Sequence, residues 1–84
     1  MEKKKIVYPL YRKYAHERTY FKVISDSEWE EIHVLAGKYS IHQFKATILP
    51  ERNYIYDLTY DYHNNWVAIQ PDEYEQVKFK AMSL

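Results

Sequence analysis

The first part of the chain has the residue types of two β-strands. Residues 6–14 are rich in aromatic and aliphatic side chains, and Pro9 within them favours an edge strand or the start of a strand. The stretch TYFKVI, residues 19–24, is rich in β-branched and aromatic types, which are enriched in strands. The tripeptide HER, residues 16–18, separates the two as a turn would. We therefore expect an N-terminal β-hairpin.

The pattern then changes to a helical spacing. Ser27 and Glu30 fit a capping box, in which a hydroxyl and a carboxylate satisfy the first free amides of a helix. Gly37 stands where a glycine commonly ends a helix. Four side chains between them recur at helical spacing: Trp29, Ile32, His33 and Ala36. The pattern predicts a helix from Asp26 to Ala36.

The next segment alternates like a strand but changes phase. Tyr39 and Ile41 alternate in one phase, whereas Phe44, Ala46 and Ile48 alternate in the other. A phase change within a strand is typical of a β-bulge. We therefore expect a strand with a bulge near His42 and Gln43, followed by a turn at PER, residues 50–52.

Tyrosine dominates the stretch NYIYDLTYDY, residues 53–62. In a strand, one face would carry Tyr54, Tyr56, Leu58, Tyr60 and Tyr62. The other face would carry Asn53, Ile55, Asp57, Thr59 and Asp61, which is too polar for a core. The tyrosine face should therefore be buried from solvent, either by packing under the helix or by binding a partner. Aromatic side chains are enriched at such interfaces.

The C-terminal part contains a turn at HNN, residues 63–65, and a short strand in WVAIQ, residues 66–70. Residues 71–82 fit either a helix or a strand. Pro71 suits the first turn of a helix. The acidic start and basic end of the segment suit the helix dipole, so we favour a helix.

These elements follow the order β-β-α-β-β-β-α. Short connections imply antiparallel pairing. The predicted fold is an α+β domain, with an antiparallel sheet of four or five strands and one or two helices on one face.

Length and composition narrow the class of protein. The 84 residues form one domain, 1–84, in which residues 1–5 are expected to be a flexible basic tail. The sequence has no cysteine and a single glycine, which excludes cysteine-ligated metals, disulfides and glycine-rich phosphate loops. We identify no signal peptide and no apolar stretch long enough to cross a membrane. A cytoplasmic protein without cofactor, metal or membrane partner is expected.

Charge is segregated along the chain although the net charge is zero. Residues 1–22 carry seven basic and two acidic side chains, and residues 23–75 carry three basic and ten acidic ones. A nucleic-acid binder would use the N-terminal cations, namely Lys3, Lys4, Lys5, Arg12, Lys13, Arg18 and Lys22. The zero net charge argues against that function, because phosphate contacts supply most of the affinity.

Residues suited to catalysis or metal binding are few. Asp57 and Asp61 would lie about 13 Å apart on a strand, too far for paired-carboxylate catalysis. The histidines lack metal-ligand spacing. If the protein is an enzyme, Glu31, His33 and His42 are the candidates, because the helix could pack near the bulge.

Two runs of the sequence resemble small conserved bacterial proteins of unknown function, of the kind studied by structural genomics. They are YRKYAHERTYFKVISDSEWEEI and GKYSIHQFKATILPERNYIYDL, which together cover most of the chain. The resemblance implies a compact α+β domain in the cytoplasm with no assigned activity. It transfers no functional residue to this chain.

The sequence thus favours a non-catalytic protein-binding or self-assembly module. Its contact surface would be the aromatic strand face and a neighbouring indole: Tyr54, Tyr56, Tyr60, Tyr62 and Trp66. A twofold homodimer is the simplest form, because small domains often complete their burial by association. A nucleic-acid accessory protein and a small enzyme without a recognisable motif remain the alternatives.

Overall fold

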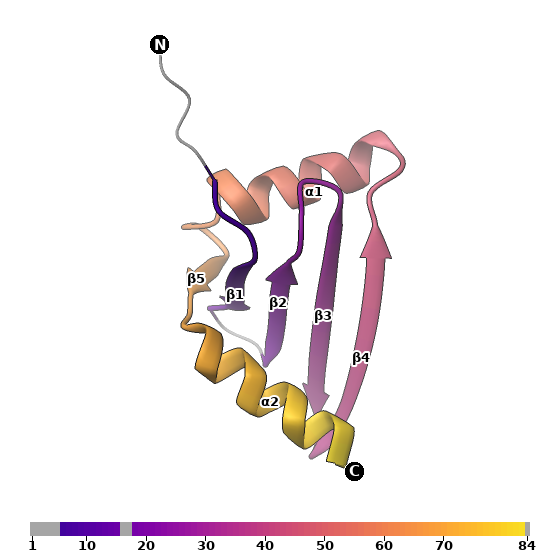
Figure 1. The fold of residues 1–84 in the computed structure, drawn as a ribbon, viewed down its shortest axis with the longest axis vertical. Coiled ribbons are helices and arrows are strands. Elements are labelled where there is room, and N and C mark those ends of the chain that lie inside the picture. The colour runs from indigo at the N-terminus through magenta and orange to yellow at the C-terminus, as the bar shows by residue number, and fades with distance from the viewer. Residues whose placement is uncertain (1–5, 16–17, 84) are drawn as a thin grey trace.

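A computed structural model describes residues 6–15 and 18–83 of the protein (Figure 1). Its elements are β1 (Leu10–Tyr14), β2 (Thr19–Val23), β3 (Glu28–Leu35), β4 (Lys38–Lys45), α1 (Leu49–Tyr60), β5 (Trp66–Ala68) and α2 (Pro71–Ser83). The described strands form one antiparallel five-stranded sheet in the order β4-β3-β2-β1-β5. The predicted α+β class is therefore confirmed. The predicted tail and most of the HER turn lie outside the described residues.

Several local predictions are confirmed as well. β1 and β2 form the expected hairpin, paired from Leu10↔Val23 to Lys13↔Tyr20. The short strand in WVAIQ is β5, and it follows the expected HNN turn. The ambiguous C-terminal segment is the helix α2, which begins at Pro71.

The predicted helix from Asp26 to Ala36 is wrong, because these residues form the turn after β2 and the strand β3. Ser27 caps no helix; its backbone N–H donates to Ser25 Oγ at 3.2 Å within the turn. Gly37 (φ 78°) and Ala36 (φ 52°) form the two-residue turn that joins β3 to β4. Positive φ at both positions is the geometry of a type I′ hairpin.

The misreading of β3 has a physical cause. Glu30 is 2% exposed and Glu31 is 8% exposed, and they point to opposite faces of the sheet. A strand with a buried carboxylate on each face does not alternate between apolar and polar residues. Its few apolar side chains, among them Trp29 and Ile32, therefore imitate a helical stripe.

The predicted tyrosine strand and the PER turn are also wrong, since both lie in helix α1. Pro50 sits in the first helical turn, where the missing amide hydrogen costs no bond. The Glu51 carboxylate accepts hydrogen bonds from the backbone N–H groups of Thr47 at 3.1 Å and Ile48 at 3.2 Å. The helix buries one stripe, made of Ile55, Leu58 and Thr59.

The predicted bulge in β4 is not observed. β3 and β4 pair without interruption from Glu28↔Lys45 to Leu35↔Lys38. The apolar phase changes because both faces of the sheet are covered, not because a residue is inserted. Ile41 stands beside Ile32 on one face, whereas Phe44 stands beside Trp29 on the other.

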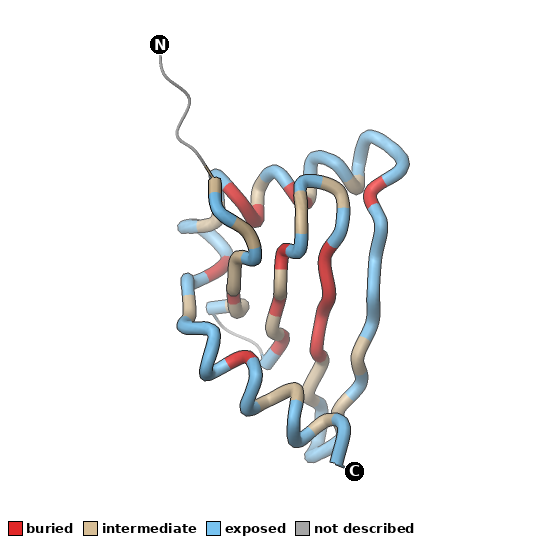
Figure 2. Tube along the Cα trace, viewed as in Figure 1, coloured by how far each residue is buried: buried red, intermediate tan, exposed pale blue. Residues whose placement is uncertain are grey.

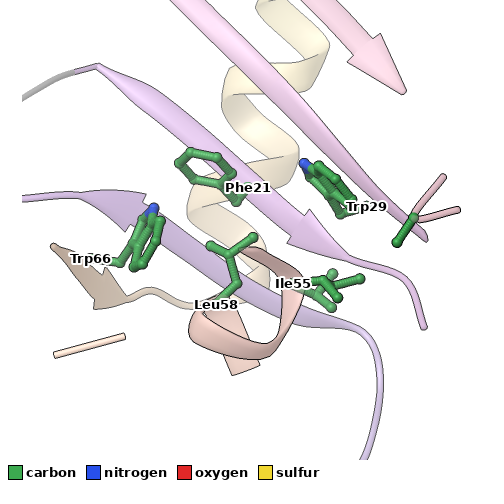
Figure 3. Packing of buried hydrophobic residues seen from close by; sticks show 7 residues of the cluster. Phe21, Trp29, Ile55, Leu58 and Trp66 are labelled. Atoms are coloured by element: carbon green, nitrogen blue, oxygen red, sulfur yellow. The ribbon is translucent and has the colours of Figure 1, made fainter. Parts of the chain in front are cut away.

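The two helices cover opposite faces of the sheet, whereas the sequence led us to expect one covered face. The α1 face holds most of the core, and Figure 3 shows Leu58 and Ile55 of α1 beside Phe21, Trp29 and Trp66. Figure 2 shows that burial concentrates in the central strands, while β4 stays pale blue along most of its length.

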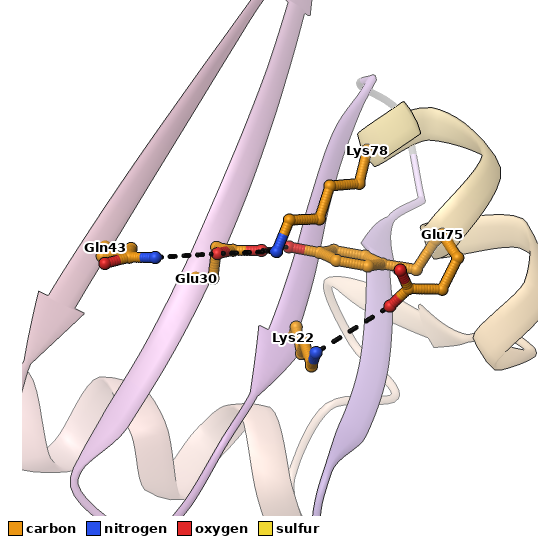
Figure 4. Close-up of polar contacts among 6 residues, drawn as sticks. Lys22, Glu30, Gln43, Glu75 and Lys78 are labelled. Carbon is orange, nitrogen blue, oxygen red and sulfur yellow. Dashed lines mark hydrogen bonds and ion pairs between the residues drawn. The ribbon is translucent and has the colours of Figure 1, made fainter. Parts of the chain in front are cut away.

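The α2 face is organised by a buried carboxylate (Figure 4). Glu30 accepts hydrogen bonds from Tyr74 Oη at 2.7 Å and from Gln43 Nε2 at 3.1 Å. Its Oε1 also lies 3.1 Å from Lys78 Nζ. Tyr74 itself is fully buried between helix and sheet. Lys22 and Glu75 form a further ion pair at 3.8 Å between β2 and α2.

We predict that Tyr74→Phe lowers the free energy of unfolding by about 1.5–3 kcal/mol, because it removes a hydrogen bond to a charged group. Urea denaturation measures this loss. Tyr11→Phe is the matched control: its ring lies 5.4 Å from that of Tyr74, but its hydroxyl has no hydrogen bond among the described residues. The control should change stability by no more than about 0.5 kcal/mol. Equal losses in both variants would contradict the assignment.

We also predict a loss of stability in acid. Burial alone would raise the pKa of Glu30, but the hydrogen bonds from Tyr74, Gln43 and Lys78 outweigh it and hold the pKa below its ordinary value of 4.5. A carboxyl with a lowered folded-state pKa stabilises the protein above pH 4.5 and loses that contribution as the pH falls through the folded value. Denaturation as a function of pH should show this fall, and Glu30→Gln should flatten it. An unchanged slope in Glu30→Gln would assign the acid sensitivity to other carboxylates.

A third prediction concerns the β3–β4 turn. Ala36 has a positive φ, which costs a residue with a side chain roughly 1 kcal/mol or more. Ala36→Asn should therefore raise the free energy of unfolding by about 1 kcal/mol, since Asn-Gly is the preferred type I′ pair. Gly37→Ala should lower it by about 1–2 kcal/mol, through backbone strain alone, because no atom lies within 4 Å of the added Cβ. Thermal or urea denaturation measures the stability of both variants. A loss of stability in Ala36→Asn would refute the turn geometry.

Candidate functional site

The five residues predicted to form an aromatic surface do not lie together. Tyr54 and Trp66 pack against each other in the core, with ring centroids 5.7 Å apart. Burial raises the pKa of Tyr54, and its hydrogen bond with Tyr14 adds to the shift. The Tyr62 ring covers the guanidinium of Arg12 at 3.9 Å. These three aromatic residues stabilise the fold on its α1 face.

Tyr56 and Tyr60 are the exposed members of the predicted surface. Their rings are 4.8 Å apart, one helical turn from each other on α1, and the residues are 58% and 52% exposed. A cavity of only about 130 Å³ lies beside them, also lined by Tyr8 and Arg52. This pair is a small aromatic patch, and it is separate from the other predicted residues.

The described N-terminal cations do not all lie on one face of the sheet. Arg12 is 7% exposed, and its Nε donates to the carbonyl of Leu58 at 3.0 Å, so it ties β1 to α1. Lys13 and Lys22 point to the opposite face of the sheet, where α2 lies. The three lysines at positions 3–5 lie outside the described residues.

The strand β4 offers a different candidate surface, its outer edge. β4 is eight residues long and ends the sheet on one side, whereas β5 at the other side has three residues. Nothing in the described chain pairs with the outer side of β4. Such an edge is a row of unsatisfied amide and carbonyl groups, which is a template for another strand.

The hydrogen-bond pattern shows which β4 residues face outward. Val34 N–H donates to the carbonyl of Arg18 at 3.0 Å, so the backbone N–H and C=O of Val34 point away from β4. Those of the next residue, Leu35, therefore point toward β4. At the far end, Ala46 N–H donates back to Ser27 at 2.6 Å. The direction of the backbone N–H and C=O groups alternates along a strand. The even-numbered residues from Lys38 to Ala46 therefore direct these groups inward, toward β3. The outward groups belong to the odd-numbered residues: Tyr39, Ile41, Gln43 and Lys45.

A polar and aromatic cluster lies beside this edge on the α1 face. Glu31 Oε1 is 2.8 Å from His33 Nε2, and Glu31 Oε2 accepts from Trp29 Nε1 at 2.7 Å. The His42 ring is 5.1 Å from that of His33, and Phe44 stacks on Trp29 at 5.1 Å. The three residues nominated for an enzyme thus do meet, but through strand pairing, since Glu31 stands directly opposite His42.

The chemistry available to this cluster is limited. The Glu31 carboxylate is already bonded on both oxygens, by an indole and an imidazole. His42 Nε2 lies 3.2 Å from Ser40 Oγ, but this pair is exposed and Glu31 contacts the other histidine. Among the described residues, no group of three or more His, Cys, Asp or Glu side chains could hold a metal ion. The cluster fits cross-strand stabilisation better than proton transfer to a substrate.

The sequence contained a signal for this edge that we did not use. The pair Ala36-Gly37 between two runs of β-compatible residues is close to the glycine-containing turns that mark two-residue hairpins. That turn would have assigned residues 28–45 to one long hairpin. The position of β4 at the edge of the sheet depends on the order of the strands, which the local sequence pattern does not reveal.

No family model matches the sequence, and neither a curated protein nor a solved structure matches it significantly. In the part of the chain that the structure describes, neither helix has the length and apolar character needed to cross a membrane.

We predict that Glu31→Ala lowers stability more than Glu31→Gln does. Alanine leaves the Trp29 indole N–H without an acceptor at a buried position, a loss of about 1.5–3 kcal/mol for a bond to a charged group. Glutamine keeps a carbonyl acceptor of similar length and should recover part of that loss. Urea denaturation of both variants checks the order, and equal losses would show that the indole bond contributes nothing.

Proposed function

We propose that this protein is a non-catalytic self-assembly module that forms a twofold dimer by pairing two copies of β4. The observation that carries the proposal is the outward row of backbone groups on an eight-residue, exposed edge strand. Two such edges satisfy each other's amides and carbonyls, and the two sheets become one continuous sheet.

Symmetry restricts how the two strands can pair. In a twofold antiparallel pair each sheet face continues into the second copy, so opposed residues must point to the same face. A twofold axis at Ile41 meets this condition and pairs the outward backbone groups of the two strands. Ile41 then stands opposite Ile41 of the second copy, and Tyr39 stands opposite Gln43. Backbone hydrogen bonds form at the Ile41–Ile41 pair and at the two Tyr39–Gln43 pairs.

The side chains are compatible with this register. The pair at the centre is aliphatic, and no like charges stand opposite each other, which would be unfavourable. The remaining opposed pairs are Ser40 with His42 and Lys38 with Phe44. Phe44 is 37% exposed in the single chain, so pairing would also cover apolar surface.

A second copy suits this edge better than an unrelated strand, because the sequence of β4 is complementary to itself in this register. The size of the protein favours the same conclusion. An 84-residue chain has a small core, and association is a common way for such a chain to add stability.

The test compares Gln43→Pro with Gln43→Ala by sedimentation equilibrium from low to high micromolar concentration. Both variants lose the side-chain bond to Glu30, but only proline removes the outward amide. Proline is tolerated on the solvent side of an edge strand, so the monomer should stay folded. We expect the wild type and Gln43→Ala to dimerise, and Gln43→Pro to raise the dissociation constant roughly tenfold or more.

A wild-type protein that stays monomeric at high micromolar concentration would contradict the proposal. A dimer that Gln43→Pro leaves intact would place the interface elsewhere. Since the chain has no cysteine, the register can be tested separately by mixing Ser40→Cys with His42→Cys. The Ile41-centred register brings these positions opposite each other at a distance that a disulfide spans, so the oxidised mixture should contain the crosslinked heterodimer.

A further inference from the structure

A basic hollow lies on the α2 face, between the second half of α2 and the ends of the strands. It has a volume of about 310 Å³. Cations from three different parts of the chain line it: Lys13 from β1, Arg18 from just before β2, and Lys80 from α2. Tyr20 and Tyr39 add two phenol side chains to the same wall.

A larger groove of about 860 Å³ adjoins this hollow at the tip of the β3–β4 hairpin. The two share Arg18, Val34 and Tyr39, and the larger groove adds Lys38. Among residues 6–15 and 18–83, no aspartate or glutamate lines either one. In a chain with 12 basic and 12 acidic residues, this local excess of positive charge is a distinct feature of the surface.

The cations of the hollow are only weakly neutralised within the described chain. Lys13 Nζ lies 4.0 Å from a Glu73 oxygen, and both side chains are more than a third exposed, so the pair contributes little. Within residues 6–15 and 18–83, neither Arg18 nor Lys80 has a carboxylate oxygen within 4.0 Å. Within the described chain, these side chains are therefore available to an anion from solution.

We propose that this basic hollow binds a ligand that carries more than one phosphate group. Several cations around one hollow suit a multiply charged anion, and the planar guanidinium of Arg18 can bind two phosphate oxygens at once. Lys13 on β1 and Tyr39 on β4 are three strand spacings apart, about 14 Å, which exceeds the reach of a single phosphate. The phenol hydroxyls of Tyr20 and Tyr39 can donate further hydrogen bonds. The inference is independent of the proposed β4 dimer.

The experiment uses inorganic tripolyphosphate as the probe and isothermal titration calorimetry at low salt. We expect saturable binding to the wild-type protein. Arg18→Gln and Lys80→Gln should each weaken it roughly tenfold or more, since each removes charge-assisted hydrogen bonds. Arg52→Gln is the matched control, because it removes the same charge from the α1 side of the molecule and should change the affinity by less than about threefold.

Absence of tripolyphosphate binding at low salt would overturn the proposal. Equal weakening by Arg18→Gln and Arg52→Gln would also overturn it, because only net charge would then matter. Thermal denaturation checks that the variants remain folded.

A thymidine octamer in the same titration distinguishes the source of the phosphates. Tighter binding of the octamer, weakened by Tyr39→Ala, would assign the hollow to single-stranded nucleic acid, in which bases stack on aromatic side chains. Tighter binding of tripolyphosphate, insensitive to Tyr39→Ala, would assign it to a small phosphorylated ligand.

Discussion

The burial of Glu30 between the sheet and α2 fixes how the two layers of that face fit together. An ionised carboxylate removed from water costs several kcal/mol unless donors replace the lost hydration. Here the donors come from two elements, Tyr74 and Lys78 of α2 and Gln43 of β4. Because all three must reach one carboxylate, α2 is held across β2, β3 and β4 in one orientation.

The two candidate surfaces follow from this arrangement. α2 lies on a face of the sheet and leaves the outer edge of β4 uncovered in the described chain (Figure 1). It also contributes Lys80 to the basic hollow that Lys13 and Arg18 line. One surface presents backbone hydrogen-bonding groups and the other presents charge, so they suit different partners.

The sequence predicted those elements whose residue pattern agrees with their burial. β2 and β5 have strand-forming residues at their buried positions, and α2 has its proline and acidic residues in the first turn. β3 was missed because Glu30 and Glu31 are buried on opposite faces, each satisfied by partners that the sequence does not reveal. α1 was missed because tyrosines at alternate positions look like a strand face. In the helix, however, they fall on different sides, with Tyr54 in the core and Tyr56 and Tyr60 outside. The β4 edge could not be predicted locally, since it depends on the order of strands in the sheet.

Self-assembly through β4 requires that its outward amides become hydrogen-bonded, and hydrogen exchange observed by NMR at several protein concentrations measures this directly. If two copies pair through β4, the amides of Tyr39, Ile41 and Gln43 exchange more slowly as the concentration rises. The inward amides of Ser40 and His42 should stay protected throughout, because they bond to β3. Exchange of the outward amides that remains fast and independent of concentration would contradict self-assembly through this edge.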